Sequence, residues 1–174
     1  MTRTIAVGVS ACLLGEKVRY DGDHRHDINI TGALGGFFVF VPVCPEVESG
    51  MSIPREPIRL EGDPVEPRLV TVESRIDMTK EITSFCRARV GELEKEALCG
   101  FIFKANSPSC GLFGVCVHNC GFAAGTGRGL FAAAMVERFP LLPVEEERGL
   151  TDPGAREKFI KRVFNYRDQL RACP

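Results

Sequence analysis

The sequence shows no marked excess of charge of either sign, since 22 Lys and Arg residues stand against 23 Asp and Glu residues and the formal net charge is −1. Nucleic-acid-binding domains usually carry a basic surface, and surface binding to membranes usually needs a polybasic patch. Long hydrophobic runs are missing too: the apolar run Phe37–Val43 falls far short of the roughly 20 residues that span a bilayer. These absences predict no nucleic-acid partner and no membrane, and they favour a small-molecule ligand.

A secretory leader is not expected either, because Met1–Thr4 lead directly into a predicted strand instead of a long apolar segment. Eight cysteines are nevertheless present. Without a leader they indicate a reducing compartment and thiols used in chemistry, so we expect a cytoplasmic location and no disulfide framework. With 174 residues, 44% of them hydrophobic, residues 1–174 are expected to form a single domain around one core.

Short apolar runs alternate with helical patterns along the chain. The expected strands cover residues 4–9, 37–43, 69–72, 100–104 and 141–144. The expected helices cover residues 77–97 and 130–139 and a segment that begins at Asp152-Pro153, with a short one near Asn29–Leu34. Five prolines between residues 45 and 68 make regular helix unexpected there. This order predicts an α/β fold, a three-layer Rossmann-like open sheet that is mainly parallel, with a crevice at the carboxyl ends of its strands.

Three cysteines, Cys12, Cys44 and Cys110, each follow one of these apolar runs. The carboxyl ends of parallel strands meet at one edge of a sheet, so the three thiols can converge on one crevice. Soft thiolates select iron–sulfur clusters, zinc or copper(I). Closed zinc sites and ferredoxin-type clusters normally take four ligands, often in closely spaced pairs that these cysteines lack, so three thiols suit a metal centre with one open position. The alternative is that each is a buried small hydrophobic residue.

Several longer motifs accompany these cysteines. They cover residues 12–22 (CLLGEKVRYDG), 42–48 (PVCPEVE), 54–59 (PREPIR), 104–111 (Lys104 and SPSCG) and 142–147 (LPVEEE). Together they resemble a bacterial family long described as a domain of unknown function (DUF523), which includes the thiouracil desulfidases. The resemblance extends over nearly the whole chain. It implies a 4Fe–4S cluster held by three cysteines, here Cys12, Cys44 and Cys110, whose fourth iron is open to the sulfur of a thiocarbonyl.

The resemblance also implies an enzyme that replaces C=S by C=O in a thiolated pyrimidine and releases sulfide without net electron transfer. Short members of the family resemble enzymes acting on thiouridine monophosphate and longer ones act on the free base, so the nucleotide is the expected substrate, with thiouracil as the alternative. Two residues beyond Cys44, Glu46 is the expected general base or proton shuttle. Glu48 can share that role if the segment is extended, because alternate residues of a strand face the same way.

Two serines, Ser107 and Ser109, precede Cys110 and are expected to hydrogen-bond the pyrimidine edge or the attacking water, with Ser107 placed ahead of Ser109. The competing interpretations are a solvated loop charge for Glu46 and turn capping around Pro108 for one of the serines.

A glycine-rich segment precedes the helix expected at 130–139, and the free amides of a helix amino terminus bind phosphate well. A flexible turn is the alternative. The candidates for binding substrate or phosphate are Gly125, Thr126, Gly127 and Arg128 in this segment, with Arg19, Tyr20 and Arg55 in earlier loops.

A further motif, Cys116-Val-His118-Asn-Cys120, brings two thiols and an imidazole to one side of an extended segment, so a second metal site stays open as a possibility. The rival function is a non-catalytic iron–sulfur or zinc-binding module in sulfur handling. The sequence leaves open the ring position that carries sulfur, the sulfide acceptor and the oligomeric state.

Overall fold

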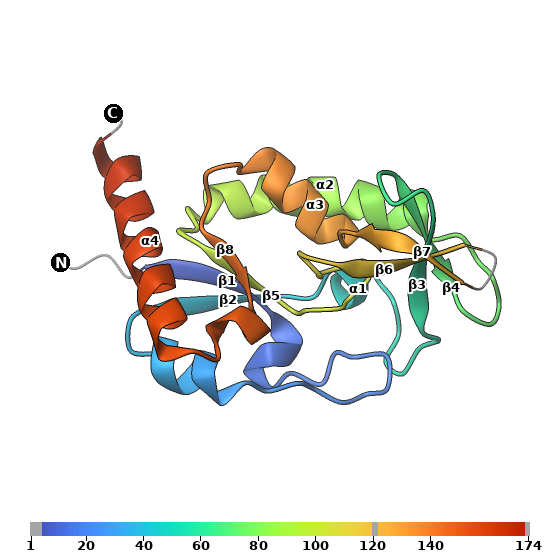
Figure 1. Ribbon diagram of the computed structural model, residues 1–174, viewed down its shortest axis with the longest axis horizontal. Helices are drawn as coiled ribbons and strands as arrows, with labels where there is room; N and C mark the ends of the chain where they lie inside the picture. The colour runs from blue at the N-terminus through green and yellow to red at the C-terminus, as the bar shows by residue number, and fades with distance from the viewer. Residues whose placement is uncertain (1–4, 120–121, 173–174) are drawn as a thin grey trace.

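The fold contains two four-stranded sheets. The computed structural model describes residues 5–119 and 122–172 (Figure 1). The first sheet has the strand order β2-β1-β5-β8 and is parallel throughout. The second has the order β4-β3-β6-β7, with a parallel β3–β6 pair between two antiparallel pairs. The strands are β1 (Ala6–Ser10), β2 (Val39–Val43), β3 (Ile58–Gly62), β4 (Pro67–Thr71), β5 (Phe101–Phe103), β6 (Val115–Asn119), β7 (Phe122–Gly127) and β8 (Val144–Glu146).

Helices cover both faces of the first sheet, as the expected three-layer α/β fold requires. The helices are α1 (Pro45–Glu48), α2 (Thr79–Lys95), α3 (Leu130–Arg138) and α4 (Pro153–Ala172), with 3₁₀ turns at Ala11–Leu14 and Glu147–Leu150 and a π-helix at Asn29–Leu34. One apolar cluster joins Phe101 and Phe103 to α2 and α3. A second joins Ile102 to α4 and the π-helix. Because successive side chains of a strand point to opposite faces, the short strand β5 serves both clusters.

The core explains two local features of the sequence. The stripe Ile82, Cys86, Val90 and Leu93 is buried along α2, as its helical spacing predicts. Gly8 lies in β1 directly against a Phe101 ring, because a Cβ atom at this position would come 2.3 Å from Phe101 Cδ2. No other residue can therefore occupy this position without displacing the ring.

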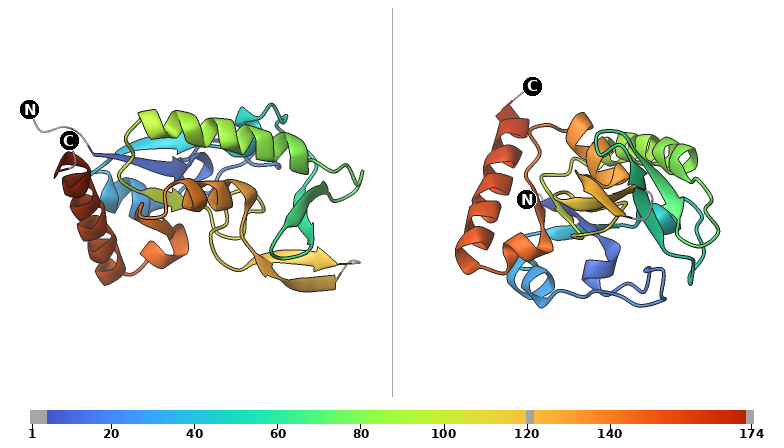
Figure 2. Two further views of the ribbon diagram at one scale, coloured as in Figure 1. Left: turned by 90° about the horizontal axis from the view of Figure 1, so that it is seen from above. Right: turned by 45° about the vertical axis from the view of Figure 1, so that its right-hand side comes forward.

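The second sheet was not expected. Of its four strands, only β4 corresponds to a predicted strand, and the glycine-rich residues 125–127, expected to be a loop, belong to β7. The segment 45–68 also begins with the short helix α1, whose first residue is Pro45, a position where proline is favoured because no amide hydrogen is needed. Figure 2 shows this sheet at the end of the molecule opposite α4. In the described part of the chain, no helix is both long and apolar enough to cross a membrane.

Candidate metal centre and active site

The carboxyl ends of β1, β2 and β5 open into one pocket of about 440 Å³, and Cys12, Cys44 and Cys110 all line it. The register brings the strand ends together, since Ser10 at the end of β1 pairs with Val43 at the end of β2. The hydroxyl of Ser10 also accepts a hydrogen bond from the amide of Lys104, just after β5, at 2.9 Å. Three thiols that are distant in the chain therefore share a single pocket.

Burial dominates the electrostatics of these thiols. It raises the pKa of Cys12 to about 11, with a further upward contribution from the charge of Cys44. Burial likewise raises the pKa of Cys44, and that of Cys110 well above its ordinary value, where Cys44 is again the next contributor. Metal ligation needs thiolates, so any metal centre that binds here displaces protons from the three thiols.

The donor set fits an iron–sulfur cluster. Among residues 5–119 and 122–172, no group of three or more His, Cys, Asp or Glu side chains lies close enough together to hold a single metal ion. A lone zinc ion needs its sulfur ligands about 2.3 Å from one point. A cluster instead takes each cysteine on a separate iron, so its thiolates lie apart by the width of the cluster. Cys12, Cys44 and Cys110 supply three soft donors around one pocket, which suits the larger group.

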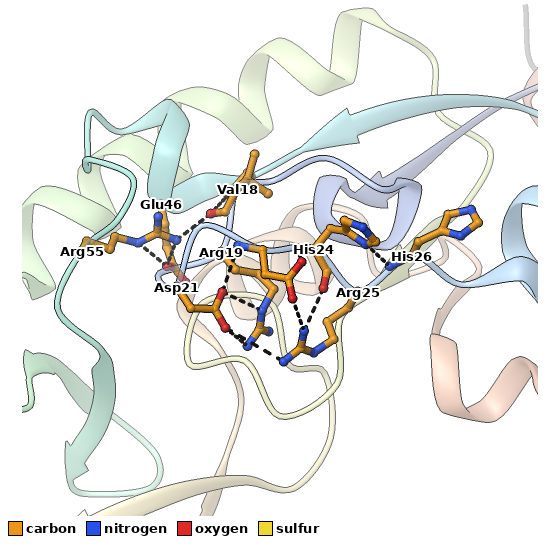
Figure 3. Close-up of polar contacts among 10 residues, drawn as sticks. Val18, Arg19, Asp21, His24, Arg25, His26, Glu46 and Arg55 are labelled. Carbon is orange, nitrogen blue, oxygen red and sulfur yellow. Dashed lines mark hydrogen bonds and ion pairs between the residues drawn. The ribbon is translucent and has the colours of Figure 1, made fainter.

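The carboxylate of Glu46 lies in the same pocket and is held from two sides. Its Oε2 atom accepts hydrogen bonds from Arg55 Nε at 3.0 Å and Arg55 Nη2 at 2.5 Å. Its Oε1 atom accepts a hydrogen bond from Ser109 Oγ at 2.8 Å, and Ser109 is 0% exposed. Arg55 Nη2 also donates to the carbonyl of Val18 at 2.9 Å, which ties the first loop to this ion pair (Figure 3).

The two serines have different surroundings. Ser107 lines the pocket, and its hydroxyl accepts hydrogen bonds from the amides of Ser109 at 3.3 Å and Cys110 at 3.0 Å. Ser107 therefore closes the turn that carries Cys110, which matches the capping interpretation for one of the pair. Ser109, placed second from the sequence, makes the direct contact with Glu46.

The expectation that Glu48 shares the role of Glu46 does not hold in this geometry. Residues 45–48 form a helical turn, not an extended segment, so side chains two positions apart point in different directions. Glu48 Oε1 accepts a hydrogen bond from the amide of Cys44 at 2.7 Å, and Glu48 Oε2 accepts one from Arg89 Nε at 2.7 Å. Its carboxylate is thus bound between Cys44 and α2.

Arg19, Tyr20 and Arg25 also line the pocket. The Arg19 guanidinium lies 5.4 Å from the centre of the Tyr20 ring. Asp21 lies between the two arginines, with Arg19 Nε at 3.3 Å and Arg25 Nη2 at 4.0 Å (Figure 3). Two guanidinium groups and an aromatic ring are therefore grouped on the first loop, between the 3₁₀ turn that holds Cys12 and the π-helix.

Two further cations line the pocket: Arg25, and Lys104, which belongs to one of the sequence motifs but was given no role from the sequence. Lys104 Nζ donates to the carbonyl of Ala105 at 3.0 Å and pairs with Glu147. Its position just after a buried strand, the criterion that selected the cysteines, was a usable signal. The sequence gives no such signal for Arg25, because this residue lies in a long polar loop.

The glycine-rich phosphate candidates lie outside this pocket. Thr126 pairs with Cys116 within the β6–β7 ladder, so this part of the backbone is strand and not the amino terminus of a helix. Arg128 Nε donates to the carbonyl of Leu112 at 3.1 Å, and its side chain lines a separate hollow beside α2 and α3. Of the phosphate candidates, Arg19, Tyr20 and Arg55 line the thiol pocket, and the Arg55 guanidinium is engaged by Glu46.

The possible second metal motif lies on β6. Cys116 is exposed and His118 is partly exposed, whereas the alternating Val115 and Val117 are buried. The third member, Cys120, lies outside the described residues. The exposed side of β6 thus carries the first two members of the motif, as an extended segment requires.

Comparisons with known proteins agree with this site. A profile of the 2-thiouracil desulfurase family matches residues 7–147, which contain all three pocket cysteines and Glu46. A solved structure, that of the [4Fe-4S]-dependent thiouracil desulfidase TudS, is similar with a TM-score of 0.67 and 30% identity, covering 84% of this chain and 93% of that one. The uncharacterized protein YbbK of Bacillus subtilis (strain 168) is 32% identical over 108 residues, which cover 59% of this chain and 71% of that protein.

Proposed function

Because the chain belongs to the 2-thiouracil desulfurase family, we propose that it removes sulfur from a thiolated pyrimidine nucleotide, replacing C=S by C=O and releasing sulfide. The family and the similar solved structure indicate an iron–sulfur-dependent thiouracil desulfidase. The observation that carries the proposal is the single pocket shared by Cys12, Cys44, Cys110 and Glu46. Its strand-end position is where open α/β sheets place their ligands.

Cys12, Cys44 and Cys110 would hold a 4Fe–4S cluster. When bound, the cluster supplies a Lewis-acidic iron that polarises the substrate sulfur and makes it a better leaving group. The three cysteines follow three different strands and are far apart in the chain. Of the described cysteines, the remaining three lie elsewhere: Cys86 on α2, Cys99 before β5 and Cys116 on β6.

Glu46 would act as the general base. Its carboxylate takes a proton from a water molecule as the water oxygen bonds to the ring carbon, and the C–S bond then breaks as C=O forms. In balance, C=S and H₂O give C=O and H₂S, so no oxidant or reductant is consumed. Arg55 and Ser109 hold the carboxylate in one orientation, which keeps it aimed into the pocket.

The pocket also offers contacts for a nucleotide. Tyr20 presents an aromatic ring on which a pyrimidine can stack, and Ser107 lines the same space. Arg19 and Arg25 flank Asp21, and a substrate phosphate would offer both guanidinium groups a stronger partner than the shared carboxylate. This arrangement supports a monophosphate over the free base.

Anaerobic reconstitution followed by a substrate panel tests the proposal. The panel contains thiolated pyrimidine bases, nucleosides and monophosphates, with sulfide and product measured together. We expect turnover of a thiolated monophosphate, and a Glu46→Gln variant that keeps its iron but loses turnover. Protein that holds one zinc and no labile sulfide, or a Glu46→Gln variant as active as the wild type, would instead support a non-catalytic module.

A further inference from the structure

One connection at the edge of the pocket has no part in the proposed chemistry: the contact from α2 through Glu48 to the backbone of Cys44. Arg89, on α2, is only 15% exposed in its side chain and donates from Nε to Glu48 Oε2 at 2.7 Å. The other oxygen of the same carboxylate accepts the amide hydrogen of Cys44 at 2.7 Å. One carboxylate therefore joins a long helix to a residue whose thiol lines the pocket.

The contact acts on the start of α1. Cys44 is the residue before the first turn of this helix, and Glu48 is its last residue. A glutamate side chain that accepts the amide hydrogen of the residue before the helix fixes the direction in which the chain enters that helix, as in a capping box. The helix has only four residues, so it has few internal hydrogen bonds with which to set its own direction. Its direction determines where Cys44 and Glu46 point.

Arg89 itself is firmly placed. Its Nη1 atom also donates to Glu92 at 3.3 Å and to Glu96 at 3.2 Å, both on or next to α2. The adjoining stripe of α2, which includes Val90 and Leu93, is packed into the core. The guanidinium therefore holds the Glu48 carboxylate in a fixed position relative to a helix that is packed in the core.

We propose that Glu48 and Arg89 are positioning residues, which fix the backbone of Cys44 so that its thiolate and the Glu46 carboxylate keep one relative placement in the pocket. This inference rests on the proposed function, because it treats Cys44 as a cluster ligand. The carboxylate also occupies the Cys44 amide, which is then not available to a cluster sulfur. Hydrogen bonds to sulfur raise the reduction potential of a cluster, and loss of an outer partner of a metal ligand typically costs about 10- to 100-fold in metal affinity or activity.

Two substitutions at Glu48 separate the hydrogen bond from the charge. Glu48→Gln and Glu48→Ala lose the same charge, but only the glutamine keeps an oxygen that can accept the Cys44 amide. Loaded holoprotein is given an iron chelator, and iron loss, reduction potential and turnover per cluster are recorded. We expect Glu48→Ala to lose iron about tenfold or more faster than Glu48→Gln. We also expect Glu48→Ala to have a higher cluster reduction potential and a lower kcat than Glu48→Gln, with little difference in KM.

A pair of arginine variants supplies the matched control. Arg89→Met removes the guanidinium that holds Glu48, whereas Arg138→Met removes one that pairs with Glu94 on the same helix, remote from the pocket. We expect faster iron loss from Arg89→Met alone, with similar melting temperatures for the two apo-proteins. If Glu48→Ala does not fold, the comparison of Arg89→Met with Arg138→Met still tests the positioning role.

Two outcomes overturn the inference in distinguishable ways. If the wild type loads with iron but Glu48→Ala matches Glu48→Gln, or Arg89→Met matches Arg138→Met, the positioning role fails and the proposed function stands. If the wild type takes up no iron, the proposed function fails and this inference fails with it.

Discussion

Replacing Ser109 with alanine is the sharpest perturbation of the proposed base. Ser109 is 0% exposed and donates its only side-chain hydrogen bond to Glu46 Oε1 at 2.8 Å. The substitution removes one oxygen atom, so the core is expected to stay intact. A hydrogen bond to a charged group contributes about 1.5 to 3 kcal/mol. If that energy orients the carboxylate for proton transfer, its loss lowers kcat by about 10- to 150-fold.

The assay is turnover of a thiolated pyrimidine monophosphate by reconstituted enzyme, expressed per cluster. KM is expected to change little, because Arg55 still holds the other oxygen of Glu46. Ser49→Ala is the matched control, since Ser49 Oγ donates to the backbone carbonyl of Glu46 at 2.7 Å and not to its carboxylate. Unchanged kcat in Ser109→Ala, or an equal loss in Ser49→Ala, would refute the orienting role.

Three further substitutions test a pocket arginine, the buried carboxylate of Glu61 and the core. Arg25→Met should raise the KM for a thiolated monophosphate about tenfold and leave the KM for the free base unchanged. Equal effects on both substrates would contradict a contact between Arg25 and the phosphate. Hydrogen bonds from Arg75, and then Arg59, hold the pKa of Glu61 at about 2, below its ordinary 4.5. This stabilisation is complete above about pH 4.5 and is lost as the pH falls toward 2. Between pH 4.5 and 2 the free energy of unfolding, measured with urea, should therefore fall by about 1 to 2 kcal/mol less in Glu61→Gln than in the wild type. The range is reduced because Arg75 is half exposed, and an equal fall in both proteins would contradict the prediction. Gly8→Ala should destabilise the protein by about 1 to 3 kcal/mol, because its Cβ would clash with Phe101, and an unchanged melting temperature would contradict that packing.

Much of the first sheet could be predicted from the sequence because its central strands, β1 and β5, are buried by helices on both faces. Continuous apolar runs are typical of such strands. The run Phe37–Val43 also indicated the edge strand β2, although only Val43 of that strand is buried. The second sheet follows a different rule. Its strand β6 alternates buried Val115 and Val117 with Cys116 and His118, and this period of two was interpreted as a possible metal motif instead of a half-buried strand.

The site could be predicted as far as strand ends determine it. Cys12, Cys44 and Cys110 follow strands that lie side by side, so their shared pocket follows from topology. Side-chain direction could not be predicted in the same way. In the helical segment α1 the side chains of Glu46 and Glu48 point to nearly opposite sides, whereas in a strand they would point to the same side. The spacing of the two residues does not reveal whether the segment is helical or extended.

The most direct test of the cluster site is a count of iron and acid-labile sulfide in reconstituted wild type and in four cysteine variants. With Cys12, Cys44 and Cys110 as the three ligands, the wild type should hold about four of each per chain. Cys86→Ala, which alters a core cysteine on α2, should match it. Alanine at any of the three pocket cysteines should abolish both counts. Full iron and sulfide in any one of those three variants would contradict the shared cluster.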